Sequence, residues 1–137
     1  MGQKLISPKS LGRPRGYSHG VLTELSGRML FIAGQIGRDQ VQPSISPDFV
    51  EQFDQALANV IAVVITAGGT ADEIVRLVIY VVDKQEYLQR TKEIGARYRA
   101  RMGKHFPAMV LVEVKGLLDD EAKVEIEGTA VISRRNE

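Results

Sequence analysis

The stretch that decides the fold is EIVRLVIYVVD, residues 73–83. It is rich in β-branched residues and apolar at both even and odd positions, and Arg76 is its one interruption. Successive side chains of a strand point to opposite faces of the sheet, so a strand that is apolar at both positions is buried on two faces. The stretch therefore predicts a central strand with both faces covered.

Ahead of this strand, the chain predicts two strands and a loop. Residues 18–36 (SHGVLTELSGRMLFIAGQI) indicate two short strands about a turn at Ser26 and Gly27. The segment 40–48 contains two prolines and is expected to be a loop.

A first helix is expected to run from this loop to Ala67. Ser46 or Asp48 is placed to cap its start, and Gly68 and Gly69 follow its end, as glycines often do past a helix C-terminus. Its apolar residues recur at spacings of four or three, which places them on one helical face: Phe49, Phe53, Leu57, Val60 and Val64.

A second helix is expected after the central strand. Asp83 followed by Glu86 resembles a capping box at its start, and Gly103 closes it. Its apolar stripe consists of Tyr87, Ile94, Tyr98 and Met102. Two final strands are expected at 108–116 and 122–133, joined by an acidic loop.

The expected order is therefore ββαβαββ, an α/β (α+β) fold. Two helices can cover only one face of such a sheet, while the central strand is apolar on both. The second face must then be buried by something outside the chain, so we expect a homo-oligomer packed sheet against sheet. A binding site would lie at the subunit seam, where clefts collect.

Composition sets limits on function. The 137 residues suit a single domain, which we place at 16–137 behind an N-terminal arm at 1–15. Lys and Arg (18) nearly balance Asp and Glu (17), which disfavours nucleic acid as a partner. Without cysteine and with only 2 histidines, the chain offers neither disulfides nor an evident metal site. No apolar stretch predicts a membrane span, so a cytoplasmic location is expected.

The last two strands carry charged residues in alternation. One face of the final strand presents Lys123, Glu125, Glu127 and Thr129, and one face of the strand before it presents Met109, Leu111, Glu113 and Lys115. One interpretation is a solvated outer face with cross-strand Lys–Glu pairs. The other places one carboxylate at the subunit seam, where it could transfer protons.

Two further segments are candidates for a site. Tyr17, in RPRGYSHG (13–20), could offer its ring and hydroxyl to a ligand, or could simply be a packing residue. The small residues of AGQIG (33–37) would allow close approach of the backbone at the end of a strand.

Several blocks, taken in order, resemble the RidA (YjgF) family, which also carries the older label endoribonuclease L-PSP. They are GYSHGV (16–21), FIAGQI (31–36), QALANV (55–60), the segment 67–83, FPA (106–108) and AKVEIEGTAV (122–131). The resemblance covers nearly the whole chain.

This resemblance implies a chorismate-mutase-like fold assembled as a homotrimer. The three sheets would form an inner barrel with the helices outside, and small-molecule clefts would lie at the subunit interfaces. The activity implied is hydrolysis of reactive 2-imino and 2-enamino acids to 2-keto acids and ammonia, with no cofactor and no metal.

The resemblance also assigns roles to residues. Glu125 fits the glutamate that positions water or passes a proton, and Tyr17 fits the tyrosine of the site. The strand bordering the cleft corresponds to Ala33, Gly34 and Gln35, although imine-hydrolysing members commonly have a small hydroxylated residue where this chain has Ala33.

The largest departure is at Met109. The family motif FPAR ends in the arginine that clamps the substrate carboxylate, whereas this chain has FPAM. A methionine thioether offers at best a weak acceptor in place of a charged, planar donor. Either another cation compensates, with Arg13, Arg15, His19 and Lys115 as candidates, or the substrate lacks a carboxylate.

Three functions follow from these observations. The first is an enamine or imine deaminase with Glu125 as its general acid and base, and with Tyr17 and Met109 contacting the ligand. The second is a trimer that binds a ligand or a protein without catalysis. The third, endoribonuclease activity, is disfavoured by the near-zero net charge and by the lack of aromatic residues interleaved with basic ones.

Overall fold

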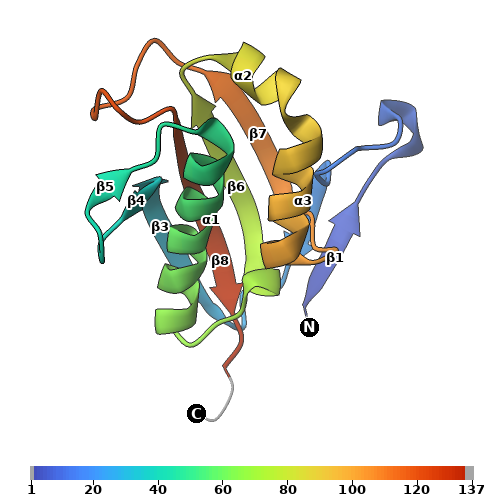
Figure 1. Cartoon of the computed structure of the whole chain (residues 1–137). Helices are drawn as coiled ribbons and strands as arrows, with labels where there is room; N and C mark the ends of the chain where they lie inside the picture. Colours follow the sequence, from blue (N-terminus) through green and yellow to red (C-terminus); the bar gives the residue numbers. More distant parts are fainter. Residues whose placement is uncertain (1, 135–137) are drawn as a thin grey trace.

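The computed structural model describes residues 2–134 (Figure 1). Its strands and helices, in chain order, are β1 (Gln3–Ile6), η1 (Lys9–Leu11), β2 (Gly20–Thr23), β3 (Arg28–Ile36), β4 (Arg38–Asp39), β5 (Ser44–Ile45), α1 (Phe49–Thr66), η2 (Ala71–Glu73), β6 (Ile74–Val81), α2 (Lys84–Gln89), α3 (Thr91–Met102), β7 (Ala108–Glu113) and β8 (Val124–Ile132). The fold is mixed α and β, as expected.

The main sheet has four strands in the order β3-β8-β6-β7. β8 runs antiparallel to both of its neighbours, whereas β6 and β7 run parallel and are connected through α2 and α3. The stretch 73–83 thus forms an inner strand of the sheet, which confirms its central place in the fold.

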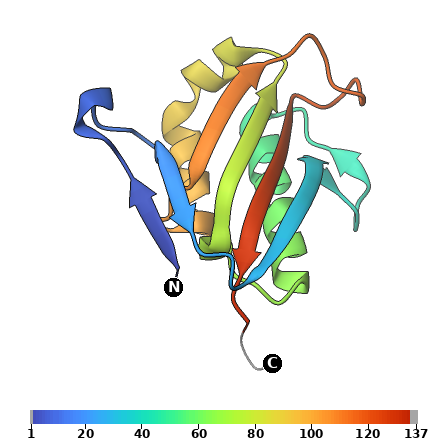
Figure 2. The ribbon, with the colours of Figure 1, turned by 180° about the vertical axis from the view of Figure 1, so that it is seen from behind.

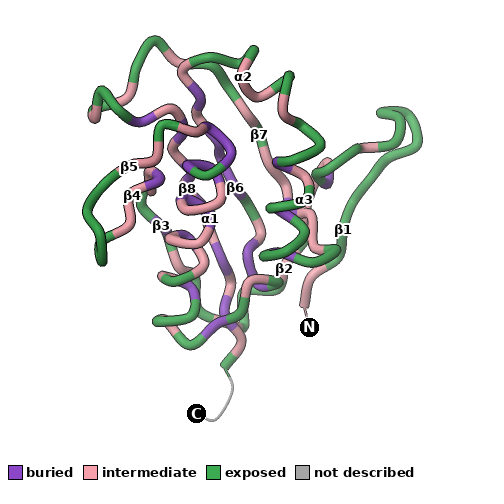
Figure 3. Tube along the Cα trace, in the orientation of Figure 1, coloured by how far each residue is buried: buried purple, intermediate pink, exposed green. Residues whose placement is uncertain are grey.

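Both long helices, α1 and α3, lie on the same face of this sheet, and the view from behind shows the other face without helices (Figures 1 and 2). The core lies between the two layers and includes Phe53, Leu57, Leu77, Tyr98 and Ile126. In Figure 3 the buried segments follow the sheet and the side of α1 that packs on it.

The open face of the sheet carries apolar side chains in contact with solvent. Phe31 is 74% exposed and Val110 is 45% exposed. Val78 of β6 also points to this face but is only 5% exposed, because it lies between the side chains of its neighbours Glu127 in β8 and Val110 in β7. The central strand is therefore apolar on both faces, while the sheet around it still presents uncovered apolar surface.

α1 starts and ends where the sequence indicated. The Asp48 carboxylate accepts a hydrogen bond from the Glu51 backbone N–H, and this contact lowers the pKa of Asp48. The helix gives way at Ala67 to Gly68, whose φ is +90°. By length and composition α1 could also span a membrane, but its buried residues form the core of the domain.

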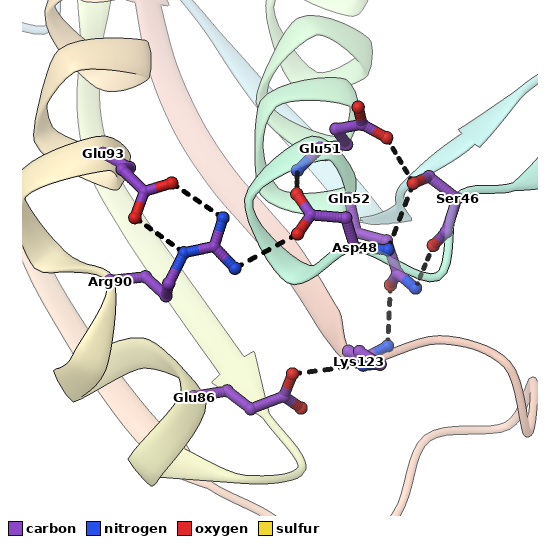
Figure 4. Close-up of polar contacts among 8 residues, drawn as sticks. All are labelled: Ser46, Asp48, Glu51, Gln52, Glu86, Arg90, Glu93 and Lys123. Carbon is purple, nitrogen blue, oxygen red and sulfur yellow. Dashed lines mark hydrogen bonds and ion pairs between the residues drawn. The ribbon is translucent and has the colours of Figure 1, made fainter.

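The expected second helix is two helices, and this part of the prediction is wrong. Asp83 accepts from the Gln85 backbone rather than forming a capping box with Glu86, and the Glu86 carboxylate pairs with Lys123 instead. The chain leaves helical geometry at Arg90, whose guanidinium binds both Glu93 and Asp48 (Figure 4). The ion pair between Arg90 and Asp48 attaches the junction of α2 and α3 to the start of α1.

The two strands expected in 18–36 exist but do not pair with each other. β2 pairs with β1, whereas β3 pairs with β8. The chain turns at Leu25 and Ser26, and a β-carbon on Gly27 would lie 2.5 Å from the Ile132 carbonyl oxygen, so the connection passes close against the end of β8. The β1–β2 pair consequently lies beside β7, at the other edge of the sheet from β3 (Figure 2).

Three short strands were not expected, namely β1, β4 and β5. β1 lies within residues 1–15, and β5 lies within the segment 40–48 that the two prolines predicted to be a loop. β5 is only two residues long and pairs with β4. Pairing this short does not show up as a periodic pattern in the sequence.

Candidate functional site

The Glu125 carboxylate lies on the open face of the sheet. Glu125 is opposite Tyr80 of β6 on one side and Ile36 of β3 on the other. Together with Gly34 and Asp119, these strands form a cleft of about 430 Å³, lined by Gly34, Ile36, Leu118, Asp119 and Glu125. Glu125 is half-buried there.

The backbone of β3 comes unusually close to this carboxylate. The register between β3 and β8 shifts between Ile32 and Gln35, so the strand bulges at Ala33 and Gly34. A β-carbon added to Gly34 would lie 2.2 Å from Oε2 of Glu125. Only glycine leaves the carboxylate in its place. The small residues of AGQIG therefore do allow the close approach that the sequence predicted.

A second carboxylate, that of Glu127, lies two residues further along β8 on the same face. The Tyr80 hydroxyl donates a hydrogen bond to Glu127, and this bond raises the pKa of Tyr80. The Glu127 carboxylate is therefore bonded to Tyr80, whereas the Glu125 carboxylate makes no side-chain hydrogen bond within residues 2–134. Of the two carboxylates, Glu125 is the one available to a ligand.

Met109 lies on the opposite face of the sheet. In the β6–β7 register it stands opposite Leu77, which is fully buried under the helices. Met109 lines a cavity of about 260 Å³ between β7 and the α2–α3 layer. The residues around this cavity are Gly16, Phe53, Ile79, Tyr87, Thr91, Ile94, Gly95, Tyr98, Arg99, Phe106 and Met109.

The segment that contains Tyr17 is attached to the start of β7. Ser18 is buried, its backbone N–H donates to the Pro107 carbonyl at 3.0 Å, and its hydroxyl donates to the Phe106 carbonyl. This holds Gly16 at the cavity of Met109 and leaves Tyr17 38% exposed, with its ring edge-on to His19.

The six candidate residues thus fall into two groups on opposite faces. Gly34 and Glu125 share the cleft on the open face, and Ala33 belongs to the same bulge. Gln35 follows the bulge and pairs with the buried Ile126. Met109 lies in the cavity under the helices, with the Tyr17 segment at its edge. Within one chain the two groups do not form one pocket.

Two residues beyond these six belong to the same surroundings. Tyr80 stands next to Glu125, but the sequence did not single it out, because it counted as part of the apolar run at 73–83. Arg99 lines the Met109 cavity, whereas none of Arg13, Arg15, His19 and Lys115 does. Nothing in the spacing of Arg99 distinguished it from the other arginines of its helix.

Comparison with known proteins agrees with this architecture. Residues 8–132 match the endoribonuclease L-PSP family. The chain belongs to the RidA/YjgF family. It is 35% identical over 108 residues to the 2-iminobutanoate/2-iminopropanoate deaminase of Salmonella typhimurium, covering 77% of this chain and 80% of that protein. A RutC family protein of Pyrococcus horikoshii is 32% identical, with 90% of each chain covered.

Solved structures of RidA/YjgF relatives share the fold. YyfB of Yersinia pestis, a Rid-family protein of unknown function, superimposes with a TM-score of 0.84 at 34% identity, over 96% of this chain and 100% of that one. The YjgF product of E. coli gives a TM-score of 0.67 at 33% identity, over 94% of each chain.

Proposed function

We propose that this RidA-family protein is a cofactor-independent hydrolase of enamine- or imine-type metabolites, acting in the cytoplasm. The observation that carries the proposal is the Glu125 carboxylate, which is half-buried against Gly34 and makes no side-chain hydrogen bond within residues 2–134. Relatives at about one-third identity that are named 2-iminobutanoate/2-iminopropanoate deaminase support the reaction class.

In the proposed reaction, Glu125 acts as general base and then as general acid. Its carboxylate removes a proton from a water molecule as the oxygen attacks the carbon of the C=N bond. The protonated carboxyl group returns this proton to the nitrogen, which gives a carbinolamine. The carboxylate then takes the proton of the carbinolamine hydroxyl and passes it to the nitrogen as the C=O bond forms and the C–N bond breaks, and the products are a carbonyl compound and ammonia. The bulge at Ala33 and Gly34, with the backbone of Gln35 next to it, would hold the substrate against this carboxylate.

The other half of the site would come from a neighbouring subunit. Tyr17 and Met109 do not meet Glu125 within one chain. Met109 is on the opposite face of the sheet, and the Tyr17 segment lies along β7, which β6 separates from β8. The exposed apolar side chains of the open face, such as Phe31, support a homotrimer in which the three sheets form an inner barrel. In this assembly an edge bearing Met109 would meet the cleft of the next subunit.

Met109 makes the proposed site unlike that of the family's typical imine deaminases. Where FPAR supplies an arginine, FPAM supplies an apolar side chain at the edge of an aromatic cavity. A charge-assisted hydrogen bond contributes about 1.5–3 kcal/mol. We therefore propose that the substrate has a larger apolar portion than 2-iminobutanoate.

The test generates imines in situ with an amino-acid oxidase, from substrates that include 2-aminobutyrate, leucine and methionine, and follows their disappearance by semicarbazide trapping. The wild-type protein should accelerate the loss of at least the bulkier imines. Glu125→Gln should abolish the acceleration with the oligomer intact, whereas the control Glu127→Gln should retain most of it.

A Glu125→Gln variant that works at the wild-type rate would disprove the role of this carboxylate. No acceleration by the intact wild-type oligomer would contradict the hydrolase and leave a non-catalytic ligand-binding trimer. An endoribonuclease would instead cleave a labelled RNA under conditions where no imine is hydrolysed.

A further inference from the structure

The cavity beside Met109 has aromatic and aliphatic walls. Four of its lining residues are aromatic: Phe53, Tyr87, Tyr98 and Phe106. The rings of Tyr98 and Phe106 are stacked with their centroids 5.3 Å apart. The Tyr98 hydroxyl donates a hydrogen bond to the His105 carbonyl oxygen at 2.7 Å. Burial raises the pKa of Tyr98, so this hydroxyl stays neutral. The walls therefore suit an uncharged, apolar body.

One charged residue completes this lining, and it is Arg99. The lining contains no aspartate and no glutamate. A single positive charge beside apolar walls, with no acidic residue to neutralise it, favours a ligand that carries one negative charge.

The guanidinium of Arg99 is folded back along α3, and the residue remains exposed to solvent. A β-carbon added to Gly95, one turn earlier, would lie 3.0 Å from Nη1 of Arg99. Thr91, Gly95 and Arg99 follow one another at intervals of four residues, so they share one face of the helix, and all three line the cavity. The glycine thus leaves room for the guanidinium at the cavity mouth.

Arg99 also differs from the other arginines of this region in its partners. Arg90 binds Glu93 and Asp48, and Arg97 and Arg101 both bind Asp54. The guanidinium of Arg99 makes no hydrogen bond or ion pair with any residue in 2–134. Its five N–H donors are therefore available to an anion, and its planar fork matches a carboxylate.

We infer that Arg99 replaces the arginine missing at position 109 as the carboxylate anchor, so that the Met109 cavity binds a monocarboxylate with an aromatic or branched apolar body. This inference rests on the proposed function for the claim that the Met109 cavity is part of the substrate site. The preference of the cavity for an apolar monocarboxylate follows from its lining residues alone. It moves the anchoring charge from β7 to α3, while Met109 supplies apolar contact to the body of the ligand.

Binding can be measured without turnover. The probes are 3-phenylpropanoate and its neutral amide, 3-phenylpropanamide, titrated against the intact oligomer and followed by NMR. The acid should bind the wild-type protein roughly tenfold or more tightly than the amide, since a charge-assisted hydrogen bond is lost with the amide. Shifts should centre on residues that line the cavity.

Arg99→Gln should weaken binding of the acid by about tenfold or more and leave the amide unchanged. The matched control is Arg97→Gln, which removes the same charge from the same helix but is paired with Asp54. It should leave both affinities unchanged.

Equal affinity for acid and amide, or Arg99→Gln indistinguishable from Arg97→Gln, would overturn the inference, as would the absence of binding of either probe to the wild-type protein. These outcomes are independent of imine hydrolysis. A protein that hydrolyses imines while Arg99→Gln binds the acid normally would keep the proposed function and lose this anchor.

Discussion

Gln52 connects the first helix to the strand that carries Glu125, and its removal should strongly destabilise the protein. The side chain is 1% exposed. Its amide nitrogen donates to the Ser46 carbonyl at 2.8 Å and its oxygen accepts from the Lys123 backbone N–H at 2.8 Å (Figure 4). The amide nitrogen also donates to the Glu121 carbonyl at 3.0 Å. Three separate segments are held together by one amide.

Gln52→Ala removes all three hydrogen bonds. At about 0.5–1.5 kcal/mol each, their loss sums to about 3 kcal/mol, and the burial lost with the side-chain methylene groups adds to it. The free energy of unfolding, measured by urea denaturation at fixed protein concentration, should fall by at least this amount.

The control is Gln55→Ala, one helical turn further on. Gln55 is half-buried and makes one side-chain hydrogen bond, to Asn59 at 2.9 Å, so its loss should cost only about 1 kcal/mol. If Gln52→Ala unfolds within about 1 kcal/mol of the wild type at an unchanged m-value, the amide does not connect these segments as we describe.

Three further changes test the site and the fold. Gly34→Ala should sharply reduce imine hydrolysis in the trapping assay while the melting temperature stays near that of the wild type, because the new methyl group displaces only the flexible carboxylate of Glu125; unchanged turnover would contradict the site. Gly37→Ala should instead lower the melting temperature strongly, since its β-carbon would lie 2.6 Å from backbone atoms of the first turn of α1, and a stable variant would refute this packing. The pKa of Asp54 is lowered chiefly by its hydrogen bond from Arg101. The ion pair therefore stabilises the fold at pH values above the unfolded-state pKa of about 4. This stabilisation is lost as the pH falls through the lower pKa of the folded state. Asp54→Asn should therefore be less stable than the wild type at pH 7, with the difference shrinking in acid-denaturation measurements towards pH 3, and a constant difference would argue against the linkage.

The sequence was sufficient where a pattern is local. The apolar run at 73–83 marked an inner strand, and Asp48 and Gly68 marked the ends of α1, because capping and periodicity depend on neighbouring residues. The pairing of β2 was not predictable in this way. Whether two consecutive strands form a hairpin depends here on Gly27 passing the end of β8, a contact between residues far apart in the chain.

The same distinction between local patterns and long-range contacts applies to the candidate site. Alternation correctly placed Glu125 and Glu127 together on one face of β8, and Met109 and Leu111 together on one face of β7. It could not say that these two faces are opposite sides of the sheet, because that depends on the register of each strand with β6. Arg99 was missed since only the folded helix brings it over the cavity.

The central claim is that catalysis combines the Glu125 cleft of one subunit with the Met109 cavity of the next, and mixed oligomers test it most directly. Glu125→Gln lacks the proton-transfer group, and Met109→Trp fills part of the cavity with an indole ring. Each variant alone should be inactive in the trapping assay. Coexpressed in equal amounts, they should recover about a quarter of the wild-type rate, because random assembly gives one interface in four with both halves intact. Mixed oligomers that form but remain inactive, when the wild type is active, would contradict a site shared between subunits.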